Sequence, residues 1–188
     1  MGSKLSAMFL VFSCLAISAA AQDVPRFEIT GTYAYVHTNN PPGKCGCFPM
    51  NGGDGSIFYH LRGTLGVVAD FGSFHAGDVN STGSNLNLTS YLFGPQVRVP
   101  AGRRMAPFGH VLFGGTHASG LGYGTGDDPA NGFAFAPGGG LDLSLNRVVS
   151  IRVVEADYYF THLQNGVNSR ENNLRILTGI VLRLGHAR

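Results

Sequence analysis

The sequence predicts an all-β protein that folds as a single eight-stranded antiparallel barrel with up-and-down connections. Three observations carry this prediction. Apolar and polar residues alternate with a period of two in many segments, whereas no segment after residue 21 shows a convincing helical period of about 3.6 residues. Eight segments are candidate strands. Short turns and long loops rich in Gly, Asn, Pro, Asp and Ser alternate between them.

Two strands of the first half alternate cleanly. Residues 27–38 (FEITGTYAYVHT) place aromatic and aliphatic side chains on one face and Glu28 with threonines on the other. Residues 64–74 (TLGVVADFGSF) repeat this pattern and leave Asp70 on the polar face. Each segment is long enough for the ~9–11 residues of a tilted membrane-crossing strand.

Two strands of the second half are equally regular. Residues 133–146 (FAFAPGGGLDLSLN) oppose large apolar side chains to small residues and Asp142. Residues 173–184 (NLRILTGIVLRL) leave Arg175 and Arg183 on the polar face. In both segments the polar face therefore carries charge.

The other strands are less regular, and the same parity would place Arg98, Glu155 and Asp157 on their polar face. These strands are expected at residues 56–61, 87–99, 107–118 and 149–161. The predicted tight turns lie at 62–63, 100–106 and 146–147, and the predicted long loops lie at 39–55, 75–86, 119–132 and 162–172.

Residues 1–21 are interpreted as a cleavable signal peptide before a barrel domain at 22–188. A lysine near the start, the apolar stretch LSAMFLVFSCLAIS and the small residues before Gln22 fit this interpretation. The stretch is shorter than the ~20 residues of a membrane-spanning helix. Lipoprotein-type cleavage before Cys14 is the alternative, which the bulky Phe12 disfavours. Export leads to an oxidising compartment, where thiols can pair.

The composition fits a folded β protein and argues against a nucleic-acid binder. Glycine makes up 28 of 188 residues, well above its usual ~7%, and charged residues make up 13% against a usual ~25%. The net charge is +2 and the arginines are scattered, so no nucleic-acid partner is expected.

The apolar face predicts a barrel that spans a membrane. A soluble barrel of lipocalin type keeps apolar side chains inside, whereas a membrane barrel turns them outward. The aliphatic and aromatic face is larger than the lining of one narrow barrel requires, so we expect it outside and a polar, filled lumen inside. Tyrosines near the loop ends suit the aromatic girdle of such barrels; they are Tyr33, Tyr35, Tyr158 and Tyr159.

Several segments resemble the OmpA-like outer-membrane β-barrel family of small bacterial proteins. They are YLFGPQVRV (91–99), PFGHVLFGG (107–115), FAFAPGGGLDLSLN (133–146), VVEADYYFT (153–161) and the final NNLRILTGIVLRL. The resemblance covers essentially all of residues 22–188. It implies a barrel among outer-membrane lipids with both termini in the periplasm, assembled by the barrel-assembly machinery through its C-terminal strand. Leu182 and Leu184 stand where that strand usually ends in aromatic residues.

The inward charges are the most informative candidate site. The expected luminal charge network consists of Asp70, Arg98, Asp142, Glu155, Asp157, Arg175 and Arg183. Because buried charges have to be paired, we expect acids and arginines to form a salt-bridged plug. A gate or narrow ion path, as in a porin-like channel, is the alternative.

Cys45 and Cys47 fall in the first predicted long loop, in GKCGCFPMNGGDG. A disulfide that closes so small a ring departs from preferred geometry. A metal site would need two further ligands, and His37 and His60 are the nearest. We expect a loop disulfide or a capped loop without metal, with metal binding and free or intermolecular thiols as alternatives.

The predicted function is structural, or an adhesion and interaction role through long extracellular loops whose partner the sequence does not name. A secreted barrel that binds an apolar ligand is one alternative. A lipid-modifying barrel enzyme is another, with His162 as base and Ser169 as nucleophile near Glu171. A rim position for His162 is the simpler interpretation, so we expect no enzyme and no cofactor.

Overall fold

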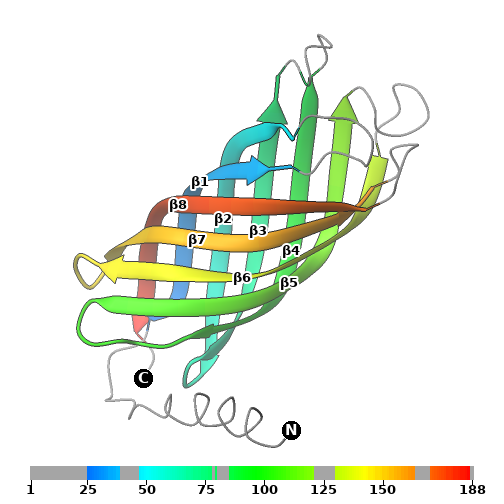
Figure 1. Ribbon diagram of the computed structural model, residues 1–188. Coiled ribbons are helices and arrows are strands. Elements are labelled where there is room, and N and C mark those ends of the chain that lie inside the picture. Colours follow the sequence, from blue (N-terminus) through cyan, green and yellow to red (C-terminus); the bar gives the residue numbers. More distant parts are fainter. Residues whose placement is uncertain are drawn as a thin grey trace, which may run out of the picture.

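The chain closes into one antiparallel barrel in which each strand pairs with the next and β1 pairs with β8 (Figure 1). The computed structural model describes residues 25–38, 47–77, 79, 85–120, 130–163 and 170–186. The strands are β1 (Pro25–His37), β2 (Pro49–Arg62), β3 (Leu65–Ala76), β4 (Leu86–Arg98), β5 (Met105–Gly120), β6 (Ala130–Ser144), β7 (Val149–His162) and β8 (Glu171–His186). The predicted fold class is confirmed, while the expected signal peptide lies outside the described residues.

Three short turns join the strands at one end of the barrel. Gly63 and Gly102 adopt φ angles of 59° and 69°, in the left-handed region that glycine enters without steric cost. The side-chain oxygen of Asn146 accepts hydrogen bonds from the backbone N–H groups of Val148 and Val149. The four longer connections lie at the opposite end.

The prediction for β2 is wrong at its start, because the strand begins at Pro49 and not near residue 56. The segment NGGDG, expected in a loop, pairs with both β1 and β3. A Cβ atom at Gly52 would collide with the backbone of Ser73. Glycine is therefore needed here for close approach of the strands, and its usual turn tendency is overridden by pairing on both sides.

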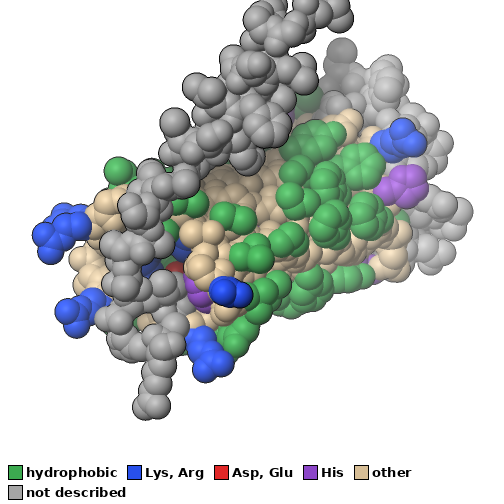
Figure 2. All heavy atoms as spheres, turned by 90° about the horizontal axis from the view of Figure 1, so that it is seen from below, with side chains coloured by type: hydrophobic (Ala, Val, Ile, Leu, Met, Phe, Trp, Pro, Cys, Tyr) green, Lys and Arg blue, Asp and Glu red, His purple; other side chains and the backbone are tan. Residues whose placement is uncertain are grey.

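The outer face of the barrel is apolar, as expected. Leu65, Val67, Phe71, Ile180 and Leu182 are between 41% and 55% exposed. Figure 2 shows hydrophobic side chains over the flank of the barrel, with arginine side chains mostly at one end. This arrangement is the inverse of a soluble barrel, so the secreted lipocalin-like alternative is wrong.

Leu141 and Leu143 share this outward face, because Asp142 between them is fully buried and adjacent residues of a strand point to opposite faces; both leucines are half-buried. Among the described residues, no helix is long and apolar enough to cross a membrane.

The expected aromatic girdle is correct for three tyrosines of four. Tyr33, Tyr35 and Tyr158 are exposed on the outer face, whereas Tyr159 is fully buried in the lumen. Adjacent residues of a strand point to opposite faces, so Tyr158 and Tyr159 could not both face lipid.

Candidate functional site in the barrel lumen

Charged side chains from all eight strands meet inside the barrel. We call them the luminal network: Glu28, Asp54, Asp70, Arg98, His110, Asp142, Arg152, Glu155, Asp157, Arg175 and Arg183. Each points inward because it occupies the inner parity of its strand. The interior of an eight-stranded barrel is just wide enough for side chains to fill, so these groups meet one another across it.

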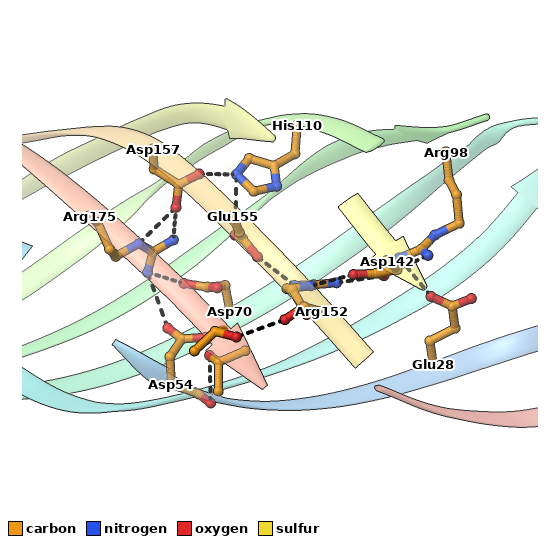
Figure 3. A network of polar contacts seen from close by, with 12 residues as sticks. Glu28, Asp54, Asp70, Arg98, His110, Asp142, Arg152, Glu155, Asp157 and Arg175 are labelled. Atoms are coloured by element: carbon orange, nitrogen blue, oxygen red, sulfur yellow. Dashed lines mark hydrogen bonds and ion pairs between the residues drawn. The ribbon is translucent and has the colours of Figure 1, made fainter. Parts of the chain in front are cut away.

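Arg175 is the centre of one half of the luminal network (Figure 3). Its Nη1 atom lies 3.1 Å from Asp54 Oδ2 and 2.9 Å from Asp70 Oδ1. Its Nε and Nη2 atoms lie 2.9 and 2.8 Å from Asp157 Oδ2. The Arg175 side chain is 0% exposed, so one guanidinium connects carboxylates of β2, β3 and β7 out of contact with water.

Arg98 and Arg152 organise the part nearer the short turns. Arg98 contacts Glu28 at 2.9 Å and Asp142 at 2.7 Å. Arg152 Nε lies 3.0 Å from Asp142 Oδ1, and Arg152 Nη1 lies 2.6 Å from Glu155 Oε2. Asp142 thus contacts both arginines, and Arg152 also contacts Glu155. Glu155 lies two residues from Asp157, which contacts Arg175.

Aromatic and peripheral contacts complete this part. The guanidinium carbons of Arg98 and Arg152 lie 5.3 and 4.3 Å from the centre of the Phe108 ring, within cation–π distance. Arg183 Nε lies 3.5 Å from Glu28 Oε1 at the edge of the network. The charges near the short turns are therefore held by rings as well as by ion pairs.

His110 lies between two carboxylates of β7. Its Nε2 atom is 2.9 Å from Asp157 Oδ1 and 3.8 Å from Glu155 Oε1. Ligand atoms of these three residues lie within 4.8 Å of one another, which is a spacing that could hold a metal ion. Each carboxylate also contacts a guanidinium, Glu155 that of Arg152 and Asp157 that of Arg175, so positive charge is already supplied.

Among the described residues of the luminal network, six carboxylates meet four guanidiniums and one imidazole. Every one of these carboxylates lies within 3.1 Å of at least one guanidinium nitrogen. Removing one partner of a buried ion pair leaves an uncompensated charge and costs ~3–5 kcal/mol. The arrangement is suited to tying the walls of the barrel together.

The lumen is not polar throughout, and in this respect the prediction is wrong. Above the luminal network, toward the long loops, apolar side chains fill the interior; they include Val36, Met50, Phe74, Ala76, Leu86, Leu88, Ala118, Ala130 and Leu163. The Phe74 ring packs edge-on against Tyr159, whose ring in turn lies under the Arg175 guanidinium. This apolar layer follows the charged layer along the axis, and it also includes the buried polar side chains of Thr116, Thr161, Glu171 and Asn173.

The structure brings all seven predicted luminal charges inside the barrel, and sequence reasoning missed others. Asp54 was missed because its segment was assigned to a loop. Arg152 was missed because the register of β7 shifts between Arg152 and Glu155, which places both inward although their spacing is odd. His110 was visible only from the parity of β5.

Glycine makes room for the luminal network. A Cβ atom at Gly138 would overlap the carboxylate of Asp157. In the GGG run of β6, Gly138 pairs with Asp157 and Gly140 pairs with Glu155 in the β6–β7 register. The missing side chains leave space for these carboxylates.

Within the part of the chain that the structure describes, the other candidate groups are not assembled into a site. Cys47 is exposed and not in a disulfide, and Cys45 lies outside the described residues. His162 is exposed on the outer face, whereas Glu171 is buried and accepts a hydrogen bond from Thr161 at 2.9 Å. The imidazole and the carboxylate of the enzyme alternative are therefore on opposite sides of the barrel wall. Its third residue, Ser169, lies outside the described residues.

Comparison with known proteins gives one family and several similar structures. The sequence profile of the outer membrane protein beta-barrel domain matches residues 7–182. No curated protein sequence matches the chain. The family match covers nearly the whole chain, including all strands but the end of β8.

The similar structures are small outer-membrane proteins. Ail, the attachment invasion locus protein of Yersinia pestis, is 17% identical with a TM-score of 0.59, over 86% of this chain and 99% of Ail. Neisserial surface protein A is 12% identical with a TM-score of 0.65, over 84% and 97% of the two chains. OprG from Pseudomonas aeruginosa is 14% identical with a TM-score of 0.56, over 87% and 98%. At these identities the likeness concerns the fold.

Proposed function

The chain belongs to the outer membrane protein beta-barrel domain family, and on that premise we propose that it is a closed, non-enzymatic barrel that displays interaction loops at the bacterial surface. The loops face outward from the cell and both termini face the periplasm. The lumen conducts no solutes, and the barrel serves as a rigid anchor for what the loops bind.

The packing of buried side chains inside the barrel is the observation that supports this proposal. The luminal network connects all eight strands, and the apolar layer lies above it along the same axis. Arginine and carboxylate side chains that are 0–7% exposed leave little contact with water at this level. A channel would need an open path along the axis, and buried side chains of both layers occupy the lumen in the described residues.

The alternation of connections supports the orientation. Outer-membrane barrels have short periplasmic turns and longer extracellular loops. The turns after β2, β4 and β6 are short, whereas residues 38–48, 77–85, 121–129 and 163–170 connect the strands at the other end. The names of two similar structures, an attachment protein and a surface protein, agree with a role at the cell surface.

Thiol labelling of intact cells tests the surface role. In a Cys45→Ser background, Cys47 at the loop end should react with a membrane-impermeant maleimide on intact bacteria. The matched control is Arg103→Cys in a C45S/C47S background, since Arg103 is exposed at a short turn. That variant should react only after the outer membrane is permeabilised. The reverse pattern would contradict the proposed orientation.

A further inference from the structure

A ring of histidines and asparagines surrounds the outside of the barrel near the long loops. Each strand that runs toward these loops carries a histidine on its outer face near its end, namely His37, His75, His117 and His162. Each returning strand carries an asparagine on the same face near its start, namely Asn51, Asn87, Asn131 and Asn172. All are exposed except His117, which is half-buried. We call these residues the His–Asn collar.

Strand register brings the members of the His–Asn collar side by side. Asn51 pairs directly with His75, His75 with Asn87, and His117 with Asn131. In the remaining five strand pairs, the histidine and the asparagine are offset by two residues in the register. In the β1–β2 pair, for example, Asn51 is opposite Tyr35, two residues before His37. Offsets of this kind keep a ring level in a barrel whose strands are tilted.

The side-chain oxygen of each asparagine accepts a hydrogen bond from a histidine or tyrosine side chain of the preceding strand. His75 Nδ1 donates to Asn87 Oδ1 at 2.7 Å, and His117 Nδ1 donates to Asn131 Oδ1 at 2.8 Å. The other two asparagines accept from tyrosine hydroxyls, Asn51 from Tyr33 at 2.6 Å and Asn172 from Tyr158.

This pattern fixes what the His–Asn collar presents to its surroundings. With the amide oxygens occupied, the asparagine NH₂ groups are available as donors. An imidazole that donates through Nδ1 has Nε2 available as an acceptor in its neutral form. At the His75–Asn87 and His117–Asn131 pairs, the collar thus presents a donor next to an acceptor.

Among the described residues, most exposed arginines stand at the short-turn end, namely Arg26, Arg62, Arg103, Arg104 and Arg147. At the long-loop end Arg170 is exposed, just before β8. Guanidinium groups bind phosphate through paired hydrogen bonds, as expected next to phospholipid headgroups. The His–Asn collar has no carboxylate, ammonium or guanidinium group, so its chemistry fits a neutral partner.

The collar also contains a hollow of about 330 Å³ where β1, β7 and β8 meet. His37, Cys47, Tyr158, Asn172, Asn173 and Leu174 line it. An aromatic ring and a leucine beside amide and imidazole groups form a wall that is both apolar and able to hydrogen-bond. A sugar ring has the matching surface, with apolar C–H faces and a rim of hydroxyls.

We propose that the His–Asn collar binds the neutral sugar headgroups of glycolipids in the membrane leaflet on the loop side. The sugar hydroxyls donate to imidazole Nε2 and accept from asparagine NH₂, and one sugar ring occupies the hollow against Tyr158. The position of the collar between the apolar outer face and the loops puts it at headgroup height. The proposal rests on the proposed loop orientation only for the choice of leaflet.

Lipid selection in symmetric vesicles tests the collar. The full mature barrel is refolded into phosphatidylcholine vesicles containing a small share of spin-labelled monogalactosyl diglyceride or, separately, spin-labelled phosphatidylglycerol. The spectrum gives the association of each lipid relative to phosphatidylcholine. The galactolipid should be enriched about two- to tenfold at the barrel, the equivalent of one net hydrogen bond. Replacing Asn87, Asn131 and Asn172 by Ala should abolish this enrichment.

An Arg103→Ala, Arg104→Ala barrel is the matched control at the other end and should retain the galactolipid selection. Equal association of galactolipid and phosphatidylcholine would overturn the proposal, as would a collar-dependent preference for phosphatidylglycerol alone. If the triple variant fails to fold, Asn172→Ala with Tyr158→Phe tests the hollow alone, and unchanged selection there contradicts the proposal. Both leaflets contain the same lipid, so an inverted orientation or a conducting lumen would leave this result unaffected.

Discussion

Arg175 and Asp157 face each other directly in the β7–β8 pairing, and both side chains are 0% exposed. Arg175 also contacts Asp54 and Asp70, which lie on β2 and β3 across the lumen. A single guanidinium therefore connects neighbouring and distant strands of the barrel wall. The stability of the barrel should depend on it more than on any exposed arginine.

Replacing Arg175 by Met should lower the free energy of unfolding by at least ~3–5 kcal/mol, because three buried carboxylates lose their partner at once. Urea unfolding from lipid vesicles, followed by circular dichroism, measures the change. Arg147→Met is the matched control at an exposed turn and should change stability by less than ~0.5 kcal/mol. Similar effects of the two substitutions would show that the luminal network is not structurally important.

Two of the three aspartates around Arg175, namely Asp157 and Asp54, should not be equivalent. Asp157 contacts two guanidinium nitrogens and His110, whereas Asp54 contacts one nitrogen at 3.1 Å. Asp157→Asn should cost ~3–5 kcal/mol, as breaking a buried ion pair does. Asp54→Asn should cost less, because carboxylates outnumber guanidiniums in the network and one fewer reduces their repulsion. The same unfolding assay compares them, and a larger loss for Asp54→Asn would refute this ranking.

The outer face should show the depth dependence of a membrane barrel. Phe71 lies in the middle of β3 and is 50% exposed, whereas Leu145 is exposed beside a short turn. Phe71→Arg should cost ~2–4 kcal/mol, the value for arginine at the bilayer midplane, and Leu145→Arg should cost ~0–1 kcal/mol. Equal unfolding free energies for these two variants in vesicles would mean that Phe71 does not face lipid.

Alternation in the sequence was sufficient to predict the barrel and the inward charges, because the strands of a membrane barrel separate apolar from polar residues at every second position. The prediction of inward residues failed where the strict alternation of a strand is interrupted or cannot be seen. The extra residue in β7 between Arg152 and Glu155 reverses the parity, so Arg152 appeared to face outward. The glycines of β2 have no side chain to show a face, so Asp54 appeared to lie in a loop.

The alternation of apolar and polar residues also does not predict the position of a residue along the barrel axis. Parity places Phe74 and Asp70 on the same inner face, but only strand pairing shows that one belongs to the apolar layer and the other to the charged layer. The His–Asn collar could not be predicted from alternation either. Its members are scattered through the sequence, and register alone brings Asn51 beside His75.

Single-channel recording tests the closed barrel most directly. Purified mature protein is inserted into planar lipid bilayers, and insertion is verified by protease protection of the strands. We predict no steady conductance, because the luminal network fills the lumen at one level and the apolar layer fills it at the next. Stable conductance steps from the unmutated protein would contradict the account.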